Sequence, residues 1–221
     1  MTTLQAIDTV ASWKLGGIYT DESAANTQQK ILSLLNTARA KVLRDIYVAT
    51  RTIPQVAYQE FDIVPSWEDE ECVSFVAKVP MIMTFPAPQL NGWDAVLPKC
   101  DCAYGLTEIK SEQQLRAYRS HPHMKSFRTA GWYIVTNTFM KGILAPKVKA
   151  DGLLGRAVIS NPEDVINFNI AMDEYPLPED MFSEVKKVLE GDDGKRWFRI
   201  VPDQISNTKV DADATSTASG R

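Results

Sequence analysis

The chain has 221 residues, 24% of them charged, and a formal net charge of −4. This length suits one domain, or one domain with a sizeable insertion. The acidic balance argues against wrapping nucleic acid, which needs a basic surface, and no apolar run approaches the roughly 20 residues of a membrane-spanning helix. The N-terminus shows no secretion signal, and three cysteines, an odd number, indicate a reducing compartment and no disulfide framework.

Two amphipathic helices are predicted near the N-terminus. The first follows Thr2 and Thr3, which can cap it, and ends at Gly16 and Gly17. Its apolar stripe comprises Leu4, Ile7, Ala11 and Leu15.

The second helix, Ser23 to Thr50, has the longest unambiguous period in the chain. Asp21 and Ser23 are its candidate caps, and Pro54 prevents its continuation. Its apolar residues are Ile31, Leu34, Leu35, Ala38, Val42 and Ile46. A stripe of this length must be buried against another element.

From Val56 to about Asn161 the sequence reads as short strands punctuated by prolines. The predicted strands are Phe61–Val64, Cys72–Val76, Met81–Phe85, Trp132–Thr136 and Phe139–Leu144. Trp132–Thr136 is the best of them because it is rich in aromatic and β-branched residues. A short helix is predicted over Ser111–Tyr118, with Leu115 as its inner contact.

Helical signals return late in the chain. Asn161-Pro162-Glu163-Asp164 resembles a helix start, and Pro178-Glu179-Asp180 is a better one, with Gly191 as the stop. The inner face of this last helix comprises Met181, Val185, Val188 and Leu189. It is the predicted partner of the long N-terminal helix.

The predicted fold class is therefore α+β, with a small helical core built from the two chain ends around a β-rich insertion. The expected divisions are 1–55 and 161–195 for the helical core, 56–160 for the insertion and 196–221 for an extended tail. The tail from Asp203 to Arg221 has almost nothing to bury. We therefore expect neighbouring subunits to order it.

One pattern suggests catalysis. Asp94 or Asp101, followed by Glu108-Ile109-Lys110, resembles the arrangement in which two carboxylates hold Mg²⁺ and a lysine orients water for nucleic-acid cleavage. The alternative is a set of solvated charges on a strand or turn, because the pattern is short and common.

A second pattern suggests zinc. Cys100 and Cys102, with His121 and His123, supply four ligands of suitable softness, but the spacing is tighter than in most structural sites. The alternative is small buried cysteines and loop histidines.

Two tryptophans in polar surroundings, Trp67 and Trp93, are candidate interface anchors. Packing within the subunit is the alternative for both.

Asp173-Glu174-Tyr175-Pro176-Leu177-Pro178-Glu179-Asp180-Met181 resembles the C-terminal part of the tail ring proteins, or head-to-tail connectors and portal adaptors, of crAss-like podoviruses. Further stretches agree in order. They are Leu35–Arg44, Trp132–Thr136 followed by Lys147–Gly152 and Asn161–Val165, and the polar tail Asp203–Lys209. Thr208 stands where that family has a second asparagine.

This resemblance implies a structural bacteriophage virion protein of the neck, assembled in the host cytoplasm and acting without cofactor, metal or catalysis. Its implied partners are other copies of itself in a ring, commonly twelve, together with the portal protein and other neck rings. DNA passes through the ring during genome ejection without specific binding. In the tail, Ile205, Asn207 and Val210 are the expected partner-binding residues.

Two other functions are kept as alternatives. One is a Mg²⁺-dependent nuclease or DNA-processing protein that uses Asp101, Glu108 and Lys110. The other is a monomeric, metal-stabilised binding module.

Overall fold

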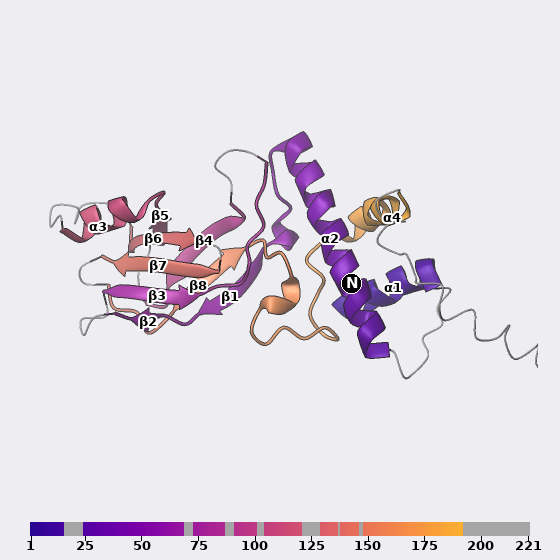
Figure 1. Ribbon diagram of the computed structural model, residues 1–221, viewed down its shortest axis with the longest axis horizontal. Helices are drawn as coiled ribbons and strands as arrows, with labels where there is room; N and C mark the ends of the chain where they lie inside the picture. Colours follow the sequence, from indigo (N-terminus) through magenta and orange to yellow (C-terminus); the bar gives the residue numbers. More distant parts are fainter. Residues whose placement is uncertain are drawn as a thin grey trace, which may run out of the picture.

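The computed structural model describes residues 1–15, 24–68, 73–86, 91–100, 104–120, 129–136, 138–145 and 148–191. Its helices are α1 (Thr3–Leu15), α2 (Ala24–Thr50), α3 (Glu112–Ser120) and α4 (Phe182–Glu190). Figure 1 shows α1, α2 and α4 at one end of the molecule, the strands at the other, and α3 beyond the strands. The fold is α+β, as predicted.

Helix α1 begins at a reciprocal cap. The amide of Gln5 donates to Thr2 Oγ1 at 3.3 Å, and the amide of Thr2 donates back to Gln5 Oε1 at 2.9 Å. The prediction that Thr2 caps this helix is confirmed. Gly16, Gly17, Asp21 and Ser23 lie outside the described residues.

Helix α2 ends where the sequence predicts. Arg51 has a left-handed backbone, with φ 57°, and its amide donates to the Tyr47 carbonyl at 2.8 Å. The guanidinium carbon of Arg51 lies 5.8 Å from the Tyr47 ring centroid. Pro54 then starts the chain toward the strands.

The buried face of α2 forms the centre of the helical core. Ile31, Leu35, Ala38 and Val42 are buried as predicted, while Leu34 and Ile46 are partly buried. Helix α4 covers this face with Phe182, Val185 and Leu189, and α1 adds Ile7 and Val10. The last helix is therefore the partner predicted for the long one. The described region 56–160 also contributes to this core, through Ala57, Met83, Phe85 and Val158.

The strands form two sheets. They are β1 (Gln59–Ile63), β2 (Ser66–Trp67), β3 (Ser74–Lys78), β4 (Trp93–Pro98), β5 (Leu106–Glu108), β6 (Gly131–Thr136), β7 (Phe139–Leu144) and β8 (Leu153–Ala157). One sheet has the order β1-β8-β4 and the other β2-β3-β7-β6-β5. Every pairing is antiparallel except that of β5 with β6.

The two sheets share an apolar core, and α3 covers the outer face of the larger one. Alternation along β6 directs Tyr133 into the core between the sheets and Trp132 toward α3. The Trp132 and Tyr118 rings stack with centroids 4.8 Å apart and planes 6° apart, and Leu115 packs beside them. The prediction for Leu115 is confirmed.

A close approach inside the larger sheet requires a glycine. Gly142 of β7 lies opposite Phe75 of β3, and the Phe75 ring occupies the space that a Cβ atom at position 142 would need.

Two sequence predictions are wrong in detail. Met81–Phe85 is not a strand in a sheet; within the described ranges it makes the isolated bridges Ile82–Ile159 and Thr84–Asn91, and Met83 and Phe85 pack into the helical core. Asn161–Asp164 starts no α-helix. Pro162–Asp164 is a single 3-10 turn, and the Asn161 side chain makes no capping hydrogen bond to its backbone.

Candidate functional site

A fully buried arginine joins the helical core to the strands. Arg39, in the middle of α2, has no exposed surface. It donates from Nε to the Pro176 carbonyl at 2.9 Å, and from Nη1 to the Ile159 carbonyl at 2.8 Å. A third bond, from Nη2, reaches the Ala57 carbonyl at 3.4 Å. One side chain therefore holds three segments that are distant in sequence.

A chain of polar side chains lies beside this arginine. Tyr175 donates its hydroxyl to Asn36 Oδ1 at 3.0 Å. The Asn36 amide donates to both carboxylate oxygens of Glu163, at 3.0 and 2.9 Å. The guanidinium carbon of Arg39 lies 5.9 Å from the Tyr175 ring centroid. We call Asn36, Arg39, Glu163 and Tyr175 the polar joint.

Burial shifts the pKa values of Arg39 and Tyr175. It lowers the pKa of the Arg39 guanidinium, while Tyr175 and Glu163 oppose that shift. Burial also raises the pKa of Tyr175, and Arg39 opposes this shift. The hydroxyl therefore stays protonated at neutral pH and keeps donating to Asn36. Since Arg39 is inaccessible and already hydrogen-bonded, the joint suits a mechanical role rather than binding of a ligand.

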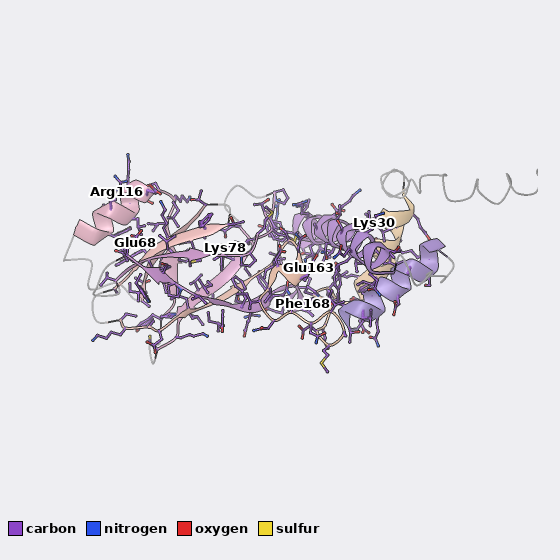
Figure 2. The ribbon with its side chains drawn as sticks, turned by 60° about the horizontal axis from the view of Figure 1, so that its bottom comes forward. Lys30, Glu68, Lys78, Arg116, Glu163 and Phe168 are labelled. Carbon is purple, nitrogen blue, oxygen red and sulfur yellow. The ribbon has the colours of Figure 1, made fainter. Side chains whose placement is uncertain are left out.

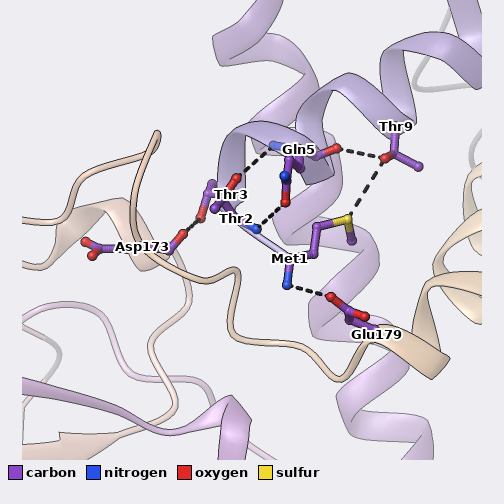
Figure 3. Close-up of polar contacts among 7 residues, drawn as sticks. All are labelled: Met1, Thr2, Thr3, Gln5, Thr9, Asp173 and Glu179. Atoms are coloured by element: carbon purple, nitrogen blue, oxygen red, sulfur yellow. Dashed lines mark hydrogen bonds and ion pairs between the residues drawn. The ribbon is translucent and has the colours of Figure 1, made fainter.

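The first residues of the chain form a second polar cluster (Figure 3). The α-amino group of Met1 lies 2.6 Å from Glu179 Oε1, just before α4. The Thr3 amide and hydroxyl both donate to the Asp173 carbonyl, at 2.9 and 3.1 Å. The start of α1 is therefore fastened to the segment that leads into α4.

Residues 165–174, between Glu163 and Tyr175 of the polar joint, form an exposed loop. Figure 2 labels Phe168 in this loop and Glu163 just before it. The Leu4 amide donates to the Ile170 carbonyl at 2.8 Å, which fastens the loop to the first turn of α1. We call this segment the 165–174 loop.

The two candidate tryptophans have different environments. Trp93 is only 8% exposed and lies between Phe61 and Tyr133, with ring centroids at 5.7 and 6.0 Å. It cannot anchor a partner in this state, so the alternative, packing within the subunit, describes it. Trp67 is half-buried, with its ring edge-on to Phe75 at 5.8 Å. Its docking role stays a prediction.

The nuclease pattern is only partly described. Asp94 pairs with Arg156 at 3.2 Å, and Glu108 accepts a hydrogen bond from the Asn91 amide. The backbone amide of Lys110 donates to Gln114 at 3.1 Å, in the turn that leads into α3. Asp101 lies outside the described residues. Within the described ranges, no three His, Cys, Asp or Glu side chains gather as a metal site would need.

The zinc pattern meets a different outcome. Cys100 is disulfide-bonded, whereas the odd cysteine count predicted a reducing compartment and no disulfide framework. A sulfur in a disulfide is not available as a thiolate ligand. Cys102, His121 and His123 lie outside the described residues, as do the tail residues Ile205, Asn207 and Val210.

No known protein family model matches the chain, and no curated protein resembles it closely enough to count as a relative. Among the described helices, none combines the length and apolar character needed to cross a membrane.

The polar joint is the feature that sequence reasoning missed. A signal for it existed: Arg39 follows Leu35 by four residues and precedes Val42 by three, so it lies on the apolar stripe. A cation in that position must be paired or hydrogen-bonded when the stripe is buried. Its acceptors are backbone carbonyls, which leave no mark in the sequence.

Proposed function

We propose that this protein is a structural subunit of a bacteriophage neck, forming a ring that joins the portal to the tail and surrounds the DNA exit channel. It acts through assembly and performs no catalysis. Its partners are other copies of itself, the portal protein and the adjacent neck rings.

The observation that carries the proposal is the meeting of three stretches on which the family resemblance rests. Asn36 and Arg39 belong to Leu35–Arg44, Glu163 to Asn161–Val165, and Tyr175 to Asp173–Met181. If a family keeps one architecture, the stretches that its members have in common are expected to meet at the same buried contacts. The ordered resemblance and this convergence support each other.

The mechanics of the joint also suit a ring subunit. Hydrogen bonds to a charged donor contribute about 1.5–3 kcal/mol each and fix direction as well as distance. They therefore set the angle between the helices and the sheets. A subunit that repeats around a closed ring needs such an angle to be the same in every copy.

Surface charge is the third support. A net charge of −4 gives a surface that DNA slides past rather than adheres to. Contacts between neighbouring subunits, and not binding to DNA, would then hold the assembly.

Negative-stain electron microscopy tests the proposal. The purified chain is mixed with the portal protein of the same virus, and each protein alone serves as a control. We expect rings with a central channel that stack coaxially on the portal. Repeated failure of the two proteins to co-assemble contradicts the proposed function.

A further inference from the structure

The 165–174 loop displays apolar side chains to solvent at high density. Ile166 is 70% exposed, Met172 76% and Ile170 38%. Several large apolar side chains exposed on one short segment make it a candidate interaction surface, whereas single exposed ones are ordinary. This segment is therefore the first place to look for a protein contact.

The loop is held in one shape before any partner arrives. The Leu4 and Thr3 amides bond its backbone from α1, at 2.8 and 2.9 Å. Within the loop, the Asn169 amide donates to Asp173 Oδ2 at 2.6 Å, and the Ala171 amide to Asn169 Oδ1 at 2.9 Å. A preorganised loop loses less conformational entropy on binding.

The stretch of sequence that contains the loop has acidic side chains and no basic ones, and the nearest cation at the start of the chain, the Met1 α-amino group, pairs with Glu179. From residue 157 to residue 185 the chain has no lysine, arginine or histidine. Its acidic residues there are Glu163, Asp164, Asp173, Glu174, Glu179, Asp180 and Glu184. A segment that binds this surface should therefore be basic as well as apolar.

One segment of the same chain has that character. Residues 194–202 read Gly-Lys-Arg-Trp-Phe-Arg-Ile-Val-Pro, which combines three cations with four large apolar residues and no acid. Trp and Arg are the residue types most enriched among binding hot spots. The segment follows α4 after a short connection.

We propose that residues 195–201 of one subunit bind the 165–174 loop of a second subunit. This inference rests on the proposed ring and deepens it, because it names the contact between neighbours. Because the loop and the segment are different surfaces, the contact can repeat head-to-tail, and such a contact forms a ring when the rotation between neighbours closes.

The direction of α4 favours a second copy as the partner. Helix α4 starts beside Met1, through Glu179, and runs toward the far end of α1, where Lys186 Nζ lies 5.4 Å from the Trp13 ring centroid. The 165–174 loop lies at the other end of α1, next to Leu4. From Leu4 to Trp13, α1 rises about 14 Å. The four residues 191–194 span roughly 14 Å at full stretch, so binding to the loop of the same subunit would need this connection and part of residues 195–201 to run back along α1.

Photocrosslinking of the full-length chain tests the contact. A benzophenone amino acid replaces Met172, and equal amounts of nitrogen-15-labelled and unlabelled protein are mixed before irradiation. We expect crosslinked peptides that contain residues 195–201 and pair labelled with unlabelled chains. Crosslinks confined within single chains, or directed to other surfaces, overturn the inference. So does a chain that stays monomeric at its highest soluble concentration.

Substitutions supply the second measurement. The double variant Ile166→Ser with Met172→Ser should weaken self-association by about tenfold or more in sedimentation velocity, because it removes apolar contact area. Val64→Ser is the matched control, since Val64 is 73% exposed and lies just after β1. Self-association should also weaken with added salt. Equal effects of the loop variant and the control contradict the inference.

The two proposals fail in distinguishable ways. If wild-type rings form on the portal but the crosslinks lie elsewhere, the neck function stands and the loop contact is wrong. If the crosslinks appear as expected but the oligomer never joins the portal, the contact stands and the neck function is wrong.

Discussion

Polar side chains reach into the packing of the helical core, whereas the two sheets meet through apolar ones. Three of the buried polar residues in the described chain, Thr3, Asn36 and Arg39, belong to α1 or α2. Between the sheets the large side chains are Phe61, Trp93, Tyr133 and others of the same type. The helical end gains a fixed geometry from directional bonds, and the sheet end gains stability from area and close packing.

The difference follows from the backbone hydrogen bonds that must be formed at each end of the molecule. The backbone groups of the strands are hydrogen-bonded to adjacent strands within each sheet, so the facing surfaces of the two sheets need only apolar contacts. Near α2, the chain at Ala57, Ile159 and Pro176 leaves its regular structure and exposes carbonyls to the core. A buried donor must reach those carbonyls.

The largest effect is expected between the sheets. Trp93→Ala opens a cavity beside Phe61 and Tyr133 and should lower the free energy of unfolding by about 3–5 kcal/mol. Urea unfolding followed by circular dichroism measures it, with Trp67→Ala as the control at a half-buried site. A loss below about 1 kcal/mol would show that Trp93 is not part of the packed core.

Arg39→Met should cost somewhat less, about 2–4 kcal/mol, because three buried carbonyls lose their donor while the apolar stem is kept. Arg44→Met is the matched control in the same helix, where the exposed guanidinium bonds the Thr84 carbonyl at 3.1 Å. Hydrogen exchange should increase around residues 57, 159 and 176 in the Arg39 variant. A uniform increase over both sheets would contradict a local joint.

Tyr175→Phe isolates one link of the joint. It keeps the ring against Phe182 but leaves Asn36 Oδ1 without its donor, and we expect a loss of about 1–2 kcal/mol. Tyr104→Phe, at an exposed position, is the control and should change nothing measurable. Equal stability of the two variants would show that the Tyr175 hydroxyl does not stabilise the joint.

The smallest effect is expected at an exposed ion pair that fastens α3 to the larger sheet. Lys141 Nζ lies 2.8 Å from Glu112 Oε1, and this bond lowers the pKa of Glu112 and raises that of Lys141. Because the carboxyl pKa is lowered on folding, the carboxylate stabilises the fold at pH values above its pKa in the unfolded chain. This contribution disappears as the pH falls through its pKa in the folded protein. Because the lysine pKa is raised on folding, the ammonium group stabilises the fold at pH values below its pKa in the unfolded chain. This contribution is lost as the pH rises through its pKa in the folded protein.

The pair therefore stabilises α3 most between the ordinary pKa values of 4.5 and 10.5. Glu112→Gln should lower the urea midpoint slightly at pH 7, and the difference from the wild type should vanish in acid. A difference that persists at low pH would mean that the carboxylate charge is not its cause. Lys186→Gln is a control, because its pair with Glu190 lies within α4.

Much of the fold was predictable because its signals are local. The spacing of Ile31, Leu35, Ala38 and Val42 predicts α2, and the β-branched and aromatic residues of Trp132–Thr136 predict β6. Met81–Phe85 was predicted wrongly because alternation of apolar and polar residues indicates that the two faces of a segment differ in environment. It does not indicate that the segment pairs with another strand. In this fold Met83 and Phe85 face the helical core, whereas Ile82 packs against the core between the sheets and Met81 is 53% exposed.

The candidate site was less predictable. The position of Trp93 in polar surroundings suggested a docking role, yet Phe61 and Tyr133 enclose it from other strands. The polarity of the residues next to a side chain in the sequence says little about its burial when its contacts come from distant strands.

The sequence alone determined where the helices and most of the strands lie, and that both chain ends build one helical core, because periodicity and capping act within a few residues. Only the tertiary structure decided that Arg39 and Tyr175 form a joint with partners 120 to 139 residues away in the chain. The acceptors of Arg39 are backbone carbonyls, which every residue carries. Their choice therefore depends on how the chain folds over α2 and not on which side chains it contains.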